Sequence, residues 1–130
     1  MGGMLVINRL KNRGIRRLKK AFGYSVAGLK VAWRNEEAFR IEVLLMIFVV
    51  PAGLWLGTTV IQRALLIGIY FIVLITELIN SAIEAVVDCI GKDPHILAGR
   101  AKDLGSAAVL VSITACFVVW GIIFYEHFIT

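Results

Sequence analysis

The sequence is poor in charge: 18% of its 130 residues are Asp, Glu, Lys or Arg, whereas 59% are hydrophobic. The run 104–124 holds no charged residue over 21 positions, and at about 1.5 Å per helical residue it is long enough to span a bilayer. Residues 43–56 and 64–76 are also free of charge. This scarcity excludes an ordinary soluble globular domain and indicates a membrane protein.

Cysteine is scarce as well, with Cys89 and Cys116 the two examples in the chain. Two isolated cysteines form neither a disulfide framework nor a zinc-binding pattern, and we interpret both as small apolar residues. The first thirty residues are basic but contain no long apolar core, so a signal peptide is not expected. The chain also lacks the glycine-rich phosphate loops of soluble ATPases and protein kinases.

What is present predicts an all-α membrane protein in one domain, residues 1–130. We expect three transmembrane helices, at residues 37–56, 64–87 and 104–125. Before them, residues 14–33 place Ile15, Leu18 and Phe22 at helical spacing, with Arg and Lys on other faces. This pattern predicts an amphipathic helix lying on the membrane surface. Asn35 is a candidate N-cap for the first transmembrane helix.

The net charge of +5 is unevenly placed. Ten of the 14 Lys and Arg residues lie within residues 1–40, one lies in the first loop and three lie within 88–103. This distribution follows the positive-inside rule, so we predict that the N-terminus and the second loop are cytoplasmic. Orientation and attraction to anionic lipid explain the basic excess, and no nucleic-acid partner is expected.

One apolar helix carries a polar stripe. Glu77, Asn80, Ser81, Glu84 and Asp88 are offset by 0, 3, 4, 7 and 11 positions, which places them on one helical face. The predicted span places Glu77 about 10 Å below the cytoplasmic interface and the later members at the interface or beyond it. Ionisable groups inside a membrane helix usually mark function, and the structural alternative for Glu77 is a buried hydrogen bond.

Three further polar side chains belong at the same interface as Glu84, namely Glu36, Lys102 and Asp103. Two carboxylates there can hold Mg²⁺ together with phosphate oxygens and water. A deeper glutamate, Glu77, can act as general base on a group presented from the lipid. The set therefore fits phosphoryl transfer to a lipid hydroxyl. Simple structural roles stay open for single residues, since Asp103 can cap a helix and Lys102 can be an ordinary interface lysine.

The motifs in this chain closely resemble those of the bacterial integral-membrane diacylglycerol kinases. They occur in order, with nearly constant spacing, from about residue 17 to residue 128. They are GYS at 23–25, AWRNE at 32–36, AFR at 38–40, ELINSAIEAVVD at 77–88, GRAKD at 99–103 and GSAAVL at 105–110.

The resemblance implies a homotrimer in the bacterial inner membrane, with active sites shared between subunits. ATP and Mg²⁺ would be used to convert diacylglycerol to phosphatidic acid. Glu77 matches the catalytic base, Glu36 and Glu84 match the metal-binding carboxylates, and Asn80 matches a polar neighbour of the base. The positions that match ATP-binding residues are Arg17, Tyr24, Glu36, Glu84, His95, Lys102 and Asp103. Those that match lipid-substrate residues are Arg17, Ser25, Trp33, Ala38, Glu42, Glu77 and Ser106.

Two other functions are compatible with parts of the pattern. The undecaprenol kinases are similar in the Glu-Leu-x-Asn and Ala-Lys-Asp elements but act on a long isoprenoid alcohol. A non-enzymatic membrane subunit whose acidic stripe relays protons or joins helices would also explain Glu77. That second alternative gives no reason for Glu36, Lys102 and Asp103 at one level, so the sequence favours the kinase.

Overall fold

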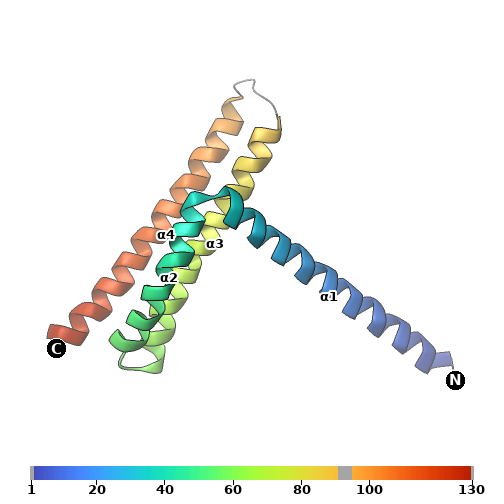
Figure 1. The fold of residues 1–130 in the computed structure, drawn as a ribbon, viewed down its shortest axis with the longest axis horizontal. Helices are drawn as coiled ribbons and strands as arrows, with labels where there is room; N and C mark the ends of the chain where they lie inside the picture. The colour runs from blue at the N-terminus through green and yellow to red at the C-terminus, as the bar shows by residue number, and fades with distance from the viewer. Residues whose placement is uncertain (1, 91–94, 130) are drawn as a thin grey trace. The chain divides into compact units, whose positions relative to one another are not determined.

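The structure, a computed structural model, describes residues 2–90 and 95–129. These residues form α1 (Gly2–Asn35), α2 (Glu37–Leu56), α3 (Val60–Ile90) and α4 (Ile96–Ile129) (Figure 1). The predicted all-α fold is therefore confirmed for this part of the chain. The chain divides into two compact units, residues 1–35 and residues 36–130. The first consists of α1, and the second contains the other three helices.

The first unit is a single helix of 34 residues, so helical structure continues on both sides of the predicted range 14–33. Leu18 and Phe22, one turn apart, are both strongly exposed. Arg16, Lys19 and Lys20 lie beside them on the same stretch. Apolar and basic side chains thus share the surface of this helix, and its location at a membrane surface stays a prediction.

The second unit is built around α3, which packs against both α4 and α2 (Figure 1). At one end, Leu56, Leu66 and Ile123 form a buried cluster with Val119 and Trp120 packed against it. The indole nitrogen of Trp120 donates a hydrogen bond of 3.2 Å to the carbonyl oxygen of Leu66. This hydrogen bond joins α4 to α3 in a fixed direction. Apolar side chains alone would not do so, because in a membrane they can contact lipid as favourably as another helix.

The turn between α2 and α3 is held by side chains of the first turn of α3. The Gln62 side-chain oxygen accepts hydrogen bonds from the backbone nitrogen and hydroxyl of Thr58, at 2.8 and 2.7 Å. Its amide nitrogen donates to Glu126 on α4 at 3.0 Å, and Arg63 donates to the Gly57 carbonyl at 2.8 Å. We call this the turn end of the unit.

Among the described residues, three helices are long and apolar enough to cross a membrane: Glu37–Leu56, Val60–Cys89 and Ile96–Ile129. The predicted number of spans is therefore confirmed by length and composition. At 31 and 34 residues, α3 and α4 reach about 46 and 51 Å, well beyond a hydrocarbon core of about 30 Å. The predicted spans 64–87 and 104–125 are shorter because hydropathy marks the apolar part of a helix, whereas backbone hydrogen bonding continues beyond it.

The helix α2 covers the predicted range 37–56, but its N-cap residue differs from the prediction by one position. Asn35 is the last residue of α1, and Glu36 occupies the N-cap position with an extended backbone (φ −105°, ψ 112°). The Glu36 side chain makes no capping hydrogen bond. Asn35 as the N-cap was therefore wrong, and the Glu36 carboxylate is not used to satisfy the helix terminus.

Candidate functional site

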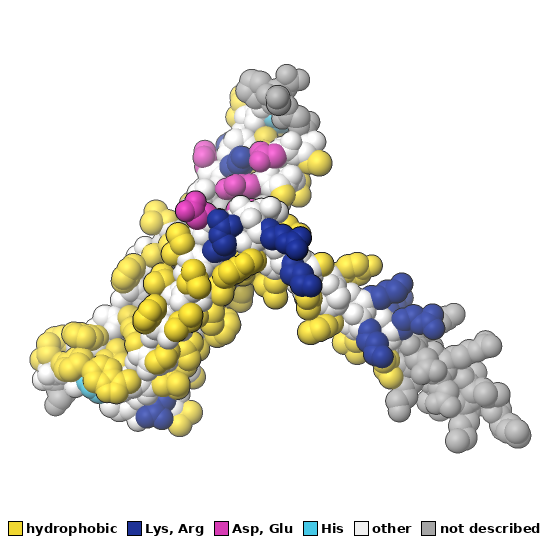
Figure 2. All heavy atoms as spheres, viewed as in Figure 1, with side chains coloured by type: hydrophobic (Ala, Val, Ile, Leu, Met, Phe, Trp, Pro, Cys, Tyr) yellow, Lys and Arg dark blue, Asp and Glu magenta, His cyan; other side chains and the backbone are white. Residues whose placement is uncertain are grey.

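The polar stripe of α3 runs from a buried position to an exposed one. Glu77 and Asn80 are 7% and 9% exposed, Glu84 is half-buried, and Asp88 is exposed. Because these residues recur at intervals of three and four, an α-helix brings them onto one face. In Figure 2 the acidic side chains gather toward the end of the unit where α3 ends and α4 begins. We call this the polar end.

Asn80 joins two parts of the site. Its side-chain nitrogen donates a hydrogen bond of 3.1 Å to Glu84, one helical turn further along α3. Its side-chain oxygen is buried and has no hydrogen-bond partner among the described residues. It lies against Gly105 of α4, where an added Cβ would collide with it. The absence of a side chain at Gly105 therefore allows the close helix approach that Asn80 makes here.

Lys102 brings a positive charge to the polar end. Its ammonium group forms an ion pair of 2.9 Å with the carboxylate of Asp88, across the connection between α3 and α4. Both side chains remain accessible, at 38% for Lys102 and 68% for Asp88. An accessible pair of this kind exchanges partners readily with solvent ions, so Lys102 can turn to an incoming anion.

Several carboxylates act on one another here. Glu77 interacts electrostatically with Glu36 and with Glu84, and Glu42 interacts with Glu77. Such a group of like charges in an apolar surrounding favours the binding of a cation. No cluster of three or more His, Cys, Asp or Glu side chains arranged to hold a metal occurs in the described ranges 2–90 and 95–129. In proteins, Mg²⁺ usually takes only one or two carboxylates, with phosphate oxygens and water completing its shell.

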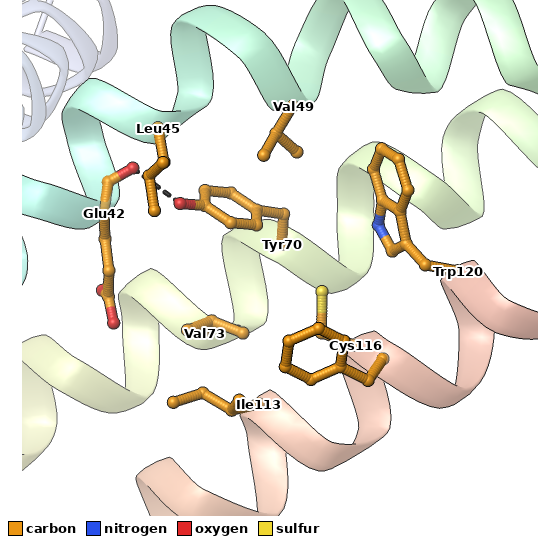
Figure 3. A pocket seen from close by; sticks show the side chains of 9 residues that line it. Glu42, Leu45, Val49, Tyr70, Val73, Ile113, Cys116 and Trp120 are labelled. Carbon is orange, nitrogen blue, oxygen red and sulfur yellow. Dashed lines mark hydrogen bonds between the residues drawn. The ribbon is translucent and has the colours of Figure 1, made fainter.

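Glu42 lies at a cavity of about 380 Å³ between α2, α3 and α4 (Figure 3). The hydroxyl of Tyr70 donates a 2.7 Å hydrogen bond to the backbone carbonyl of Glu42, and the Glu42 carboxylate points away from the Tyr70 ring. One carboxylate oxygen of Glu42 is buried and has no hydrogen-bond partner in the part of the chain that the structure describes. The rest of the lining is mostly apolar, so this acidic group has an environment that suits an apolar ligand with one polar group.

The other predicted site residues fall into two sets. Within the second unit, Ala38, Asp103 and Ser106 are exposed on α2 and α4. His95 directly precedes α4, where its carbonyl accepts hydrogen bonds from the backbone of Ala98 and Gly99. The remaining residues, Arg17, Tyr24, Ser25 and Trp33, all lie on α1 in the first unit. Their roles stay predictions.

Two interactions at the site were not anticipated from the sequence. Asp88 was placed on the stripe, but its pairing with Lys102 was not predicted. Thr76 and Ser112 were given no role, although their hydroxyl oxygens lie 2.8 Å apart and join α3 to α4 beside Glu77. The sequence does contain a signal for such a contact, since an isolated hydroxyl residue in each of two apolar segments can form a hydrogen bond between helices.

Comparison with known proteins agrees with the motifs. A family described as prokaryotic diacylglycerol kinase matches residues 23–124. A diacylglycerol kinase of Escherichia coli (strain K12) is 50% identical over 115 residues, covering 88% of this chain and 94% of the relative. Diacylglycerol kinases of Haemophilus influenzae and Helicobacter pylori (strain 26695) are 44% and 42% identical, each over 85% of this chain and over 94% and 87% of the relative. Because these matches span most of both partners, the chain belongs to the prokaryotic diacylglycerol kinase family.

Proposed function

We propose that this protein transfers the terminal phosphoryl group of ATP to the free hydroxyl of diacylglycerol, giving phosphatidic acid. The observation that carries the proposal is a buried glutamate, Glu77, in an apolar helix and within electrostatic reach of Glu36 and Glu84. Glu77 would meet the lipid hydroxyl from within the membrane, and Glu36 and Glu84 would hold the metal-bound phosphate at the interface. The two reacting groups would therefore lie side by side. Family membership supports the same reaction.

In this mechanism Glu77 is the general base. Its carboxylate accepts the proton of the lipid hydroxyl as the hydroxyl oxygen attacks the terminal phosphorus of ATP. A new phosphorus–oxygen bond forms to the lipid, and the bond between that phosphorus and the ADP oxygen breaks. Because Glu77 is 7% exposed, few water molecules compete for the phosphoryl group, which favours transfer over hydrolysis.

Glu36 and Glu84 would hold the Mg²⁺ that accompanies ATP. Their carboxylate oxygens are hard ligands that suit Mg²⁺, and this ion usually takes only one or two protein carboxylates alongside phosphate and water. When bound, Mg²⁺ neutralises charge on the transferring phosphoryl group. Asn80 supports this arrangement because its hydrogen bond fixes the Glu84 side chain.

The nucleotide and the lipid would meet at the polar end, which we place at the cytoplasmic side of the bacterial inner membrane. Lys102 would leave Asp88 to bind a phosphate oxygen. We assign the remaining residues by their match to the family motifs, and a homotrimer with shared sites completes the proposal. ATP would also contact Arg17, Tyr24, His95 and Asp103; the lipid would contact Arg17, Ser25, Trp33, Ala38, Glu42 and Ser106.

The proposal is tested with purified protein in detergent micelles supplied with Mg²⁺ and labelled ATP. Equal amounts of diacylglycerol and undecaprenol are offered together, and the labelled lipids are separated. We expect the label in phosphatidic acid. Label in undecaprenyl phosphate would contradict the assigned substrate, and the absence of labelled lipid from folded, trimeric protein would favour a proton-relay or structural subunit.

A further inference from the structure

Thr76 directly precedes Glu77 on α3 and contacts α4 through its hydroxyl. The oxygen atoms of Thr76 and Ser112 are 2.8 Å apart, and Ser112 is 6% exposed. Consecutive helical residues differ by about 100° in direction and 1.5 Å in height. Whatever fixes the rotation of α3 at Thr76 therefore also fixes the direction in which Glu77 points.

The two hydroxyl groups take part in more contacts than they have protons. Thr76 also lies 2.8 Å from the carbonyl oxygen of Val73, and Ser112 lies 2.8 Å from that of Val109. Two protons cannot serve three contacts, so one hydroxyl gives up the bond to its own helix when it donates to the other. The interhelical bond forms at the expense of a local one, which is typical of a contact that fixes position.

Asn80 approaches Gly105 closely one turn further along α3, but packing next to the hydroxyl contact itself is loose. A cavity of about 180 Å³ lies between the two helices, lined in part by Thr76, Asn80, Gly105 and Ala108. Small residues at this level give little steric resistance to rotation, and apolar contacts in a membrane are non-directional. A rotation of about 10° at a radius of about 6 Å shifts a side-chain tip by about 1 Å. The hydroxyl pair supplies the directional restraint that packing lacks here.

We propose that the hydroxyl pair of Thr76 and Ser112 is a positioning device that sets the rotation of α3 and so aims the Glu77 carboxylate at the lipid hydroxyl. This inference rests on the proposed function, because it concerns the reach of the proposed base. Neither hydroxyl touches the reacting atoms. Their effect on the reaction is exerted through Glu77, since a misplacement of about 1 Å in a catalytic group can cost up to about 100-fold in rate.

The chain supplies matched variants for a test. Thr76→Val and Ser112→Ala each remove one hydroxyl, while the partner keeps its own-helix carbonyl as an acceptor. Thr76→Ser keeps the hydroxyl. Thr114→Val is the control, because Thr114 is exposed on α4 and its hydroxyl donates within its own helix, to Leu110 at 2.8 Å.

We measure kcat and the KM values for ATP and diacylglycerol, with thermal unfolding in the same micelles. The expected result is a kcat lower by about tenfold in Thr76→Val and in Ser112→Ala, with the KM for ATP within about twofold. The double variant should lose no more than either single one, because both act through one contact. Thr76→Ser should keep at least about half of the wild-type kcat, because it keeps the hydroxyl. Thr114→Val should have the wild-type kcat.

The inference is overturned if Thr76→Val and Ser112→Ala keep wild-type kcat, if Thr76→Ser is as impaired as Thr76→Val, or if Thr114→Val shares the loss. A variant that lowers the unfolding temperature without changing kcat would show a structural role alone and would also overturn it. If Thr76→Val does not fold, Ser112→Ala carries the test, since it removes a single oxygen atom. Wild-type protein without lipid kinase activity would refute the proposed function instead, so the two failures are distinguishable.

Discussion

The side-chain oxygen of Asn80 lies so close to Gly105 that an added Cβ at Gly105 would collide with it. The same amide holds Glu84 through its nitrogen. The helix approach at this glycine and the placement of a proposed metal-binding carboxylate therefore depend on one side chain. A substitution at Gly105 on α4 should therefore displace the Glu84 side chain on α3.

Gly105→Ala tests this dependence. Asn80 must move to admit the methyl group, so its hydrogen bond to Glu84 should be lost and kcat should fall by about tenfold or more. Overpacking should also cost about 1–3 kcal/mol of stability. Gly121→Ala on the same helix is the control, because nothing lies within 4 Å of the added Cβ. Equal kcat in the two variants would contradict the proposed coupling.

The Mg²⁺ requirement of the reaction should change when Glu84 is replaced and should not change when a glutamate far from the site is replaced. Removal of Mg²⁺ by EDTA should abolish lipid phosphorylation, and added Mg²⁺ should restore it. In Glu84→Gln the Mg²⁺ concentration for half-maximal activity should rise about tenfold or more, because one hard anionic ligand is lost. Glu126→Gln is a suitable control, since Glu126 contacts Gln62 at the turn end. An unchanged Mg²⁺ requirement in Glu84→Gln would remove Glu84 from the metal site.

Substitution of Lys102 should affect the nucleotide rather than the lipid. Lys102→Met removes the ammonium group that now pairs with Asp88 at 2.9 Å. We expect the KM for ATP to rise about tenfold, because a charged hydrogen bond to phosphate is lost, while the KM for diacylglycerol changes less than about twofold. Lys30→Met on α1 controls for the loss of a positive charge. A larger rise in the KM for diacylglycerol than for ATP would show that Lys102 serves the lipid instead.

Local patterns made much of this structure predictable. The charge-free runs identified three apolar helices, and the spacing of Glu77, Asn80 and Glu84 predicted one polar face, because helical periodicity depends only on neighbouring residues. The additional length of α3 and α4 was not predictable from hydropathy. Backbone hydrogen bonds extend a helix into polar sequence without an apolar signal.

Contacts between helices were not predictable in the same way. Lys102 pairs with Asp88, a residue 14 positions earlier in the chain. Thr76 contacts Ser112, a residue 36 positions later. Each pair depends on the rotation and depth at which α3 and α4 pack, which the spacing within either helix does not determine. The hydrogen bond from Tyr70 to the Glu42 backbone likewise requires the packing of α2 on α3.

The most direct test of the central claim compares Glu77→Gln with Glu37→Gln. Glutamine keeps the size of Glu77 but cannot accept the lipid proton, and Glu37 is an exposed glutamate in the first turn of α2 with no assigned role. Both proteins are purified in micelles, shown by circular dichroism and size to be folded like wild type, and assayed for labelled phosphatidic acid. We predict a loss of about 10²–10⁴-fold in kcat for Glu77→Gln and activity within about twofold of wild type for Glu37→Gln. More than a tenth of wild-type kcat in folded Glu77→Gln would contradict Glu77 as the general base.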